Sequence, residues 1–227
     1  MTSYSIIRIY GMDCNQVEIV LNAAKTHNMK IFAGIWSLSN LQEDLKALII
    51  VAQGSWSTFI AISIGNKLVN GGLNSVVDVV DAITTSRNVL RRAGYAGPVV
   101  TIDTFTALIT HSELCRAFDF CAANCHAFFD PNTDTFNAGS FVKKQATLVS
   151  AAAGGGKTTV ITESGWPHRG GKNGLAIPSR ANQLLAVQGL KNTFVAGGGG
   201  LFLFEAFDSL WKEDREGTFG AEKFWRL

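Results

Sequence analysis

The chain has 227 residues, of which 47% are hydrophobic and 17% are charged, and its 20 basic and 18 acidic side chains give a net charge of +2. This composition excludes a disordered chain and suits one domain that is rich in buried parallel strands. The charges are interspersed without a basic stripe, so we expect no nucleic-acid partner and a neutral substrate.

Strand-like and helical segments alternate from end to end, which predicts a parallel sheet. We expect seven strands, at Ser5–Tyr10, Lys30–Trp36, Thr58–Ile64, Pro98–Asp103, Phe118–Phe128, Thr158–Glu163 and Leu201–Phe207. Apolar residues at helical spacing predict helices at Cys14–Asn28, Leu41–Ala52, Leu73–Ala93, Gly139–Ala153 and Ser179–Lys191. Asn40 and Glu43 predict a capping box at the start of the second helix, and Gly94 predicts the end of the third.

Several strands end in polar or aromatic residues, which a βα barrel would gather at one rim. They are Tyr10, Trp36, Asn66, Asp103, His126, Glu163 and Asp208. The competing architecture is an open doubly wound sheet, which needs a glycine-rich turn after its first strand; Gly11–Cys14 does not supply one. We therefore predict a single (β/α)8 TIM-barrel domain over residues 1–227. Seven strands are one too few for closure, so we expect that the first strand and helix are absent from this chain or that another segment covers the gap.

Location and redox state remain open from the sequence. No run reaches the roughly 18 consecutive apolar residues of a membrane helix. Met1–Ile6 lacks the features of a signal peptide, so we expect either a cytosolic protein or a chain that begins after a removed leader. The four cysteines allow a disulfide from Cys14 to Cys115 or Cys121, or buried thiols. Cys125 cannot bridge Cys121 if both lie on one strand, because a four-residue step spans about 13 Å.

The run Val160–Pro167 is the most informative stretch of the sequence. It predicts a strand that delivers the carboxylate of Glu163 and then breaks at Gly165, with the indole of Trp166 close behind. A carboxylate beside an aromatic ring is typical of a carbohydrate-cleaving site. The nearby segment Ala151–Thr158 matches a phosphate-binding loop loosely, but a helix precedes it and a strand follows, which is the reverse of the required order.

Seven motifs together resemble glycoside hydrolase family 17. Ile161–Pro167 resembles the nucleophile segment of that family, and Ile62–Asn70 resembles its acid/base segment. The other five occur in family order at Arg8–Gly11, Gly54–Trp56, Val99–Phe105, Phe202–Asp208 and Trp211–Lys212. The sequence is most similar to fungal cell-wall β-1,3-glucanosyltransferases and glucan endo-1,3-β-glucosidases. The resemblance implies an eight-stranded βα barrel that acts on β-1,3-glucan, without cofactor or metal, as an extracellular or cell-wall protein that we expect to be monomeric.

The resemblance also implies roles for individual residues. Glu163 corresponds to the nucleophile, Asn66 to an asparagine that hydrogen-bonds the sugar 2-hydroxyl, and Tyr10 to an aromatic hydroxyl near the reacting sugar. The other candidate substrate-binding residues are Asn124, His126, Phe128, Trp166 and Lys212. Trp166 and the Phe128–Phe129 pair resemble walls of sugar subsites, and Lys212 resembles a basic residue behind the cleft. Without the resemblance, Tyr10 and Phe128 could equally be core residues, and Lys212 a surface lysine. His126 has no partner at chelating spacing, which disfavours a metal site.

Position 67 departs from the family pattern. The family has glutamate directly after the Gly-Asn pair, and this chain has Lys67. A retaining glycosidase needs two carboxyl groups about 5–5.5 Å apart, one to attack and one to protonate the leaving oxygen. Lysine at that distance would pair with Glu163 and could not act as the acid and base, which costs on the order of a hundred- to ten-thousand-fold in rate. Ser209 is a smaller departure, because it replaces an acidic residue and is expected to loosen the hydrogen bonding around Lys212.

Three hypotheses follow from these residues. The first is a retaining β-1,3-glucan hydrolase or transglycosylase in altered form, and the second is a catalytically silent β-glucan-binding protein of the cell wall. The third is an unrelated barrel enzyme such as an isomerase, which would need a phosphate-binding glycine turn after one of its last strands. The glycine run Gly197–Gly200 precedes the last predicted strand instead of following it. The first two require that Glu163 and Lys67 face each other across one sugar-binding trench.

Overall fold

The computed structural model describes residues 4–196 and 200–227. The chain divides into two compact units, Met1–Ala122 and Ala123–Leu227, and each is described by itself. The glycine run predicted at the entry to the last strand falls largely on residues 197–199, which lie outside the described residues.

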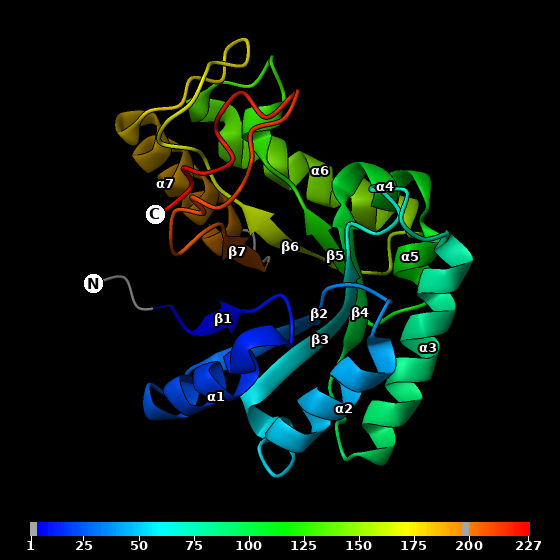
Figure 1. Cartoon of the computed structure of the whole chain (residues 1–227). Helices are drawn as coiled ribbons and strands as arrows, with labels where there is room; N and C mark the ends of the chain where they lie inside the picture. The colour runs from blue at the N-terminus through cyan, green and yellow to red at the C-terminus, as the bar shows by residue number, and fades with distance from the viewer. Residues whose placement is uncertain (1–3, 197–199) are drawn as a thin grey trace. The chain divides into compact units, whose positions relative to one another are not determined.

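The first unit is a parallel sheet with helices packed against its strands (Figure 1). Its strands are β1 (Ile6–Arg8), β2 (Lys30–Ile35), β3 (Phe59–Asn66) and β4 (Val99–Thr104). Its helices are α1 (Gln16–Thr26), α2 (Leu41–Ala52), α3 (Val76–Arg92), α4 (Phe105–Thr110) and α5 (Glu113–Arg116), with short 3-10 turns at Asp13–Asn15 and Trp56–Thr58. Neighbouring strands pair in chain order, as Ile6 with Lys30, Ile35 with Ile64 and Ile62 with Val99 show.

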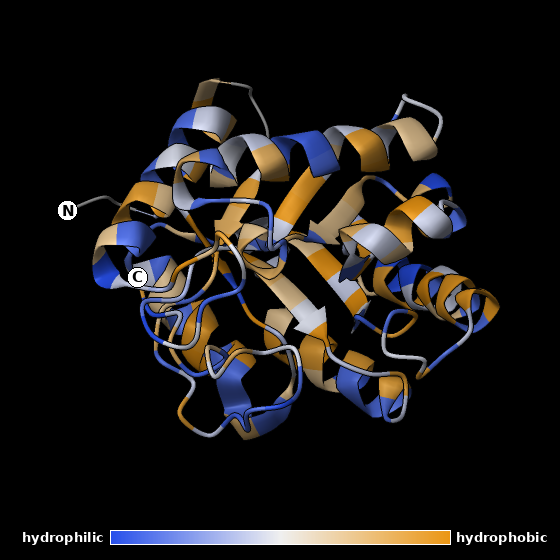
Figure 2. Ribbon diagram, turned by 90° about the horizontal axis from the view of Figure 1, so that it is seen from above, coloured by the Kyte–Doolittle hydropathy of each residue, from blue (hydrophilic) through white to orange (hydrophobic). Residues whose placement is uncertain are grey.

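The burial of these elements follows from their sequences. Strands β2 and β3 are buried almost throughout, as expected of parallel strands that are covered on both faces. Helix α1 buries Val17, Leu21 and Ala24, which recur at helical spacing on one side of the helix. In Figure 2 the strands carry orange, hydrophobic stretches, and the helices alternate between orange and blue along their length.

The second unit contains two long helices and a parallel pair of strands. Its elements are the 3-10 turns η3 (Ala127–Phe129) and η4 (Thr135–Asn137), helix α6 (Ala138–Ala152), strand β6 (Thr159–Ser164), helix α7 (Arg180–Ala196) and strand β7 (Leu201–Leu203). Strand β6 pairs with β7 from Ile161–Leu201 to Ser164–Leu203, and α6 packs against both α7 and β6. Strand β5 (Cys121–Asn124) spans the division between the units.

Most predicted elements are observed within a few residues of their expected ends, and two strands are much shorter. The strand predicted to begin at Phe118 begins at Cys121, because the preceding Asp119 turns its carboxylate to the backbone N–H of Val99. The last strand ends at Leu203, since the N–H of Glu205 donates to the carbonyl of Trp225. The backbone that follows β7 therefore binds the C-terminal segment.

The predicted capping box at Asn40 is wrong. Asn40 has φ −122° and ψ 33°, outside the extended conformation from which an N-cap side chain reaches the first turn, and its side chain makes no capping hydrogen bond. A capping box instead starts α3, where the hydroxyl of Ser75 accepts from the N–H of Asp78 and the Asp78 carboxylate accepts from the N–H of Ser75. The predicted helix end at Gly94 is confirmed by its left-handed φ of 89°.

The predicted disulfide is also wrong. All four cysteines lie among the described residues, and none is part of a disulfide. Cys14 is exposed, whereas Cys115, Cys121 and Cys125 are buried, and burial raises the pKa of the Cys125 thiol to about 12. The alternative of buried thiols therefore holds for three of the four. In residues 4–196 and 200–227, no helix combines the length and apolar character of a membrane-spanning segment.

The close approach of α6 and α7 depends on one glycine. A Cβ atom on Gly139 would lie 2.5 Å from the carbonyl oxygen of Gly189 and 2.6 Å from the hydroxyl oxygen of Thr193, whereas a Cβ on Gly189 would meet no atom within 4 Å. The two helices therefore contain one glycine that is required by packing and one that is not.

We predict opposite effects of alanine at these two positions. Gly139→Ala should lower the free energy of unfolding by about 1–3 kcal/mol, because the two helices must move apart. Gly189→Ala should raise it by roughly 0.5–1 kcal/mol through helix propensity. Urea unfolding followed by circular dichroism measures both. Equal effects of the two substitutions would contradict the packing that we describe.

Candidate active site

Glu163 is the penultimate residue of β6 and is almost fully buried, with 2% of its surface exposed. Its carbonyl oxygen accepts from the N–H of Cys125. Its carboxylate oxygen Oε2 lies 3.5 Å from Nε2 of His126, whose side chain is also largely buried. The predicted nucleophile and the predicted subsite histidine are therefore neighbours at the carboxyl end of β6.

Aromatic rings from three segments hold the imidazole of His126. The ring centroid of Trp225 lies 4.8 Å from that of His126, the ring of Phe204 lies at 5.3 Å and that of Phe129 at 6.1 Å, all in edge-to-face arrangements. Such contacts favour one orientation of each ring. The orientation of His126 toward Glu163 thus depends on η3, on the segment after β7 and on the C-terminal segment.

Asn124 is buried at the end of β5, where its side-chain oxygen accepts from the hydroxyl of Thr162 at 2.8 Å. Thr162 directly precedes Glu163 on β6. This bond between two buried polar groups fixes the end of β5 relative to β6. A carboxylate that must attack in one direction needs this kind of support.

The loop after β7 carries a second acidic group. The Glu205 carboxylate accepts from the Ser209 hydroxyl at 2.9 Å, and Lys212 Nζ lies 3.9 Å from Glu205 and 3.6 Å from Glu222. Burial raises the pKa of the Glu205 carboxyl above its usual value and the negative charge of Glu163 adds to the rise, while Lys212 and Ser209 act in the opposite direction. Lys212 therefore neutralises a carboxylate cluster next to the candidate nucleophile, and Ser209 binds Glu205 directly.

Trp166 and Phe128 do not have the surface that a sugar subsite requires. Both are fully buried, their rings pack edge to face at 5.7 Å, and the indole N–H of Trp166 donates to the carbonyl of Ile177. A ring without accessible surface cannot stack on a sugar in this conformation. Phe129 is 38% exposed and packs against Phe128, so of this aromatic pair only the second ring presents a face.

In the first unit, Arg8 organises the predicted residues at the ends of β1 and β3. Its Nη2 donates to the side-chain oxygen of Asn66 at 3.1 Å, and its guanidinium lies 4.3 Å from the ring centroid of Tyr10. Tyr10 in turn packs at 6.2 Å against Trp36, which is half exposed. The sequence identified Arg8 only as part of a motif. An arginine at the end of a strand does not reveal, from the sequence alone, which side chains it will contact.

Lys67 follows β3 in a left-handed conformation, with φ 58°. Such a conformation is strained for a residue with a Cβ and is held here from both sides. The N–H of Lys67 donates to the carbonyl of Ile102 at 2.8 Å, and its carbonyl accepts from the N–H of Gly71 at 2.9 Å. The backbone at position 67 is therefore fixed by β4 and by the following turn, whichever side chain it carries.

Asp103 also stabilises the turn that follows Lys67. Its carboxylate is buried and accepts from the backbone N–H groups of Thr104, Val69 and Asn70, at 2.7, 3.0 and 3.4 Å. Burial raises the pKa of the Asp103 carboxyl, against these hydrogen bonds and the positive charge of Lys67. The second and third residues after the candidate acid/base position, Val69 and Asn70, are thus anchored by a carboxylate at the end of the next strand.

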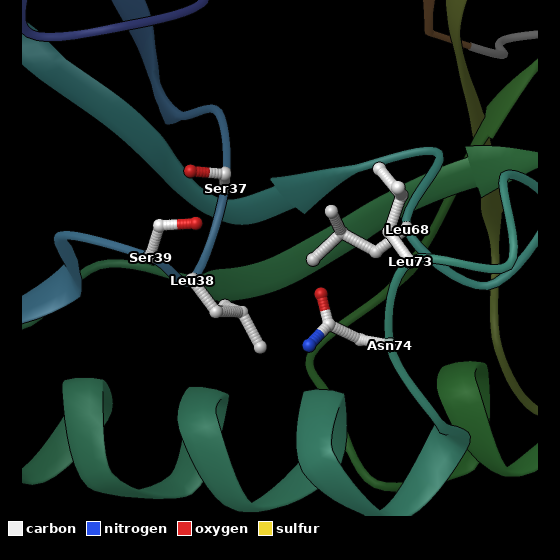
Figure 3. A pocket seen from close by; sticks show the side chains of 6 residues that line it. All are labelled: Ser37, Leu38, Ser39, Leu68, Leu73 and Asn74. Atoms are coloured by element: carbon white, nitrogen blue, oxygen red, sulfur yellow. The ribbon is translucent and has the colours of Figure 1, made fainter.

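A pocket of about 310 Å³ lies between the loops that follow β2 and β3 (Figure 3). It combines leucine side chains with two hydroxyls and an amide, and its lining residues are Ser37, Leu38, Ser39, Leu68, Leu73 and Asn74. It adjoins Trp36 in sequence on one side and the turn at Lys67 on the other. Its volume is at the lower end of the range of small-molecule sites.

The predicted residues thus form two groups. Glu163, His126, Asn124 and Lys212 belong to the second unit, and Tyr10, Asn66 and Lys67 belong to the first. That Glu163 and Lys67 face each other stays a prediction, because they lie in different units. In the part of the chain that the structure describes, no three His, Cys, Asp or Glu side chains are placed to bind a metal ion.

Comparison with solved structures confirms the fold. The structure is similar to the glycoside hydrolase family 17 β-1,3-glucanosyltransferase from Rhizomucor miehei, with a TM-score of 0.83 over 98% of this chain and 80% of that chain at 20% identity. It is also similar to a plant β-glucan endohydrolase, with a TM-score of 0.64 over 96% of this chain and 94% of that chain at 17% identity. The predicted (β/α)8-barrel fold is therefore confirmed.

Sequence comparison gives the family. The family model described as the BtgE/BtgC glycoside hydrolase domain matches residues 1–225, and the chain belongs to this family. It is 43% identical to the cell surface mannoprotein MP65 of Candida albicans and 42% identical to the probable family 17 glucosidase SCW10 of Saccharomyces cerevisiae, in each case over its whole length. The chain spans 59% of the first relative and 57% of the second.

Asp208, in the loop after β7, connects His168 to the C-terminal segment that carries Trp225. The carboxylate of Asp208 lies 3.0 Å from Nε2 of His168 and accepts from the N–H of Arg226 at 3.0 Å. Burial acts to raise the pKa of Asp208, but the hydrogen bonds and charges of Arg226 and His168 outweigh it and hold this pKa below its usual value.

We predict that this contact makes stability fall in acid. A depressed folded-state pKa contributes stability that is present above the unfolded pKa near 4 and is lost as the pH falls through the folded value. Asp208→Asn should therefore lower the free energy of unfolding at pH 6, and this loss should shrink as the pH falls below about 4. Urea unfolding at a series of pH values measures this difference, with the exposed Asp81→Asn as a control. A destabilisation that is the same at pH 6 and pH 3 would argue against the ionic contact.

Proposed function

We propose that this chain is the barrel of a retaining β-1,3-glucan hydrolase or glucanosyltransferase, in which Glu163 is the nucleophile and Lys67 occupies the acid/base position. The observation that carries this proposal is the buried carboxylate of Glu163 at the end of β6, beside His126, in a chain of the BtgE/BtgC family. The substrate class is supported by the Rhizomucor miehei β-1,3-glucanosyltransferase, whose active-site mutant was solved in complex with laminaritriose and to which this fold is similar with a TM-score of 0.82.

Glu163 is suited to the first half of the retaining reaction. Its oxygen would attack the anomeric carbon and form a glycosyl ester while the bond to the leaving oxygen breaks. The second half releases the sugar to water in hydrolysis or to a sugar hydroxyl in transfer. His126, with Trp225 and Phe204 around it, would keep the carboxylate in one orientation for both halves.

Both halves need a group that gives and then takes a proton, and Lys67 is a poor candidate. An ammonium group gives up its proton poorly near neutral pH and cannot then act as a carboxylate base. We propose that Lys67 lowers turnover on the order of a hundred- to ten-thousand-fold, which is the usual contribution of this catalysis. The anchored backbone at position 67 supports a site that would accept glutamate without rearrangement.

The remaining candidates would bind the sugar. Asn66, oriented by Arg8, would hydrogen-bond the 2-hydroxyl, and Tyr10 would lie beside the reacting ring. Asn124, which is bonded to Thr162, and Lys212, which is paired with Glu205, would hydrogen-bond sugar hydroxyls near the carboxylates. Trp166 and Phe128 are buried and are not proposed as stacking residues.

A catalytically silent β-glucan-binding protein is the second candidate, and Lys67 is the observation that favours it. Such a protein would keep the sugar-binding residues and lack turnover. For either function we propose an extracellular, cell-wall location, which the name of one relative, a cell surface mannoprotein, supports. We also propose that the protein is a monomer.

Restoring the missing carboxyl group separates the two candidates. We predict that Lys67→Glu raises the rate at which laminarihexaose is converted to shorter or longer chains by at least about a hundredfold. Lys67→Gln is the matched control, because it removes the positive charge without supplying an acid, and it should stay near the wild-type rate. Chromatography of the products measures hydrolysis and transfer together.

Three outcomes decide the matter. If Lys67→Glu raises the rate of laminarihexaose conversion and the double variant Lys67→Glu/Glu163→Gln loses this increase, the enzyme with Glu163 as nucleophile is supported. A folded Lys67→Glu variant that binds laminarihexaose but leaves it unchanged supports the silent binding protein. If calorimetry detects no binding of laminarihexaose to the wild-type chain or to either variant, both proposals are wrong.

A further inference from the structure

The loop after β7 exposes three large apolar side chains in a short stretch. Phe207 is 79% exposed, Leu210 is 68% exposed and Trp211 is 81% exposed. Isolated exposed apolar residues are common on protein surfaces, but three within five positions, two of them aromatic, are a local concentration of exposed apolar side chains along the chain. We call residues 207–211 the exposed aromatic loop.

The exposed aromatic loop is held in place by its polar residues. Asp208 binds His168 and the N–H of Arg226, as described above. The N–H of Ser209 donates to the carbonyl of Lys223 at 3.1 Å, and the N–H of Lys212 donates to the carbonyl of Ser209 at 3.0 Å. Because the polar side chains point inward and the backbone is fixed, the apolar side chains are directed into solvent by the fold itself.

The loop is also continuous with the candidate active site. It follows Glu205, whose pKa is raised in part by the charge of Glu163, and Lys212 comes directly after it. Nζ of Lys212 lies 4.8 Å from the ring centroid of Phe204 and 5.9 Å from that of Trp211. Phe204 itself packs against His126. A ligand that rests on Trp211 would therefore lie on the same loop as the groups that surround the candidate nucleophile.

The charges near the loop define the chemistry of its ligand. Residues 205–216 contain five acidic and two basic side chains, which disfavours nucleic acid or another polyanion. An exposed indole beside carboxylates and an ammonium group suits a neutral ligand with apolar faces and hydroxyl edges. A pyranose ring has this combination, because its C–H groups lie on its faces and its hydroxyls at its rim.

We propose that Trp211, flanked by Phe207 and Leu210, is a stacking platform for a glucosyl unit of β-1,3-glucan outside the pair of sugars that react. This inference rests on the proposed function and names a further binding residue for the same substrate. The platform would hold the glucan by contact with the indole face, and Lys212 and the neighbouring carboxylates would hydrogen-bond the hydroxyl edge. Longer glucans would gain affinity from it, and short ones would not reach it.

The test compares binding of laminaribiose and laminarihexaose to the wild-type chain by calorimetry. Trp211→Ala should weaken laminarihexaose binding by about tenfold, which corresponds to the loss of roughly 50 Å² of buried apolar contact. It should leave laminaribiose binding unchanged, and Trp211→Phe should retain most of the affinity for the longer sugar. Phe136→Ala is the matched control, because Phe136 is 77% exposed in the same unit but far from this loop in sequence. Thermal unfolding confirms that each variant is folded.

The outcomes separate this inference from the proposed function. If the wild-type chain binds laminarihexaose and folded Trp211→Ala binds it equally well, the platform is wrong and the proposed function stands. If the wild-type chain binds no laminarihexaose, both are wrong. If sedimentation shows that the wild-type chain self-associates and Trp211→Ala does not, with no change in sugar affinity, the loop is a protein contact and the platform is likewise overturned.

Discussion

The carboxylate of Glu163 imposes the main constraint on the second unit, because a buried charge is costly unless the surrounding groups are arranged around it. The structure places His126 at 3.5 Å from this carboxylate, and a hydrogen bond from Thr162 anchors the end of β5. Lys212 pairs with Glu205, the second carboxylate of the candidate site. Each of these groups comes from a different segment. The contacts that hold these segments of the second unit together are therefore also the contacts that position the candidate nucleophile.

In the first unit, the contacts that hold the turn at Lys67 do not use the side chain of Lys67. The turn at Lys67 is shaped by backbone hydrogen bonds to Ile102 and Gly71 and by the buried carboxylate of Asp103. None of these contacts involves the side-chain atoms of residue 67. Glutamate or lysine at this proposed acid/base position would therefore find the same backbone, and the two side chains would differ in their proton chemistry.

The sequence predicted the parts of the structure that local rules determine. Periodicity gave helix Leu41–Ala52 at its observed ends, Gly94 marked the end of α3, and the break after Glu163 placed that residue at the end of a strand. Features that depend on distant contacts were missed. Trp225 lies in an irregular segment without periodicity, and its role appears only once it packs on His126. Trp166 was predicted to face a sugar, but the direction in which a ring points after a strand is decided by packing and not by the motif that contains it.

The distribution of the cysteines gives a way to follow both units in solution. Cys14 is accessible, while Cys115 and Cys121 are enclosed in the first unit and Cys125 in the second. An alkylating reagent should consequently modify a single sulfur on the native protein and all four after denaturation. Mass spectrometry of the labelled peptides would then report, sulfur by sulfur, which half of the molecule opens first when the protein is warmed.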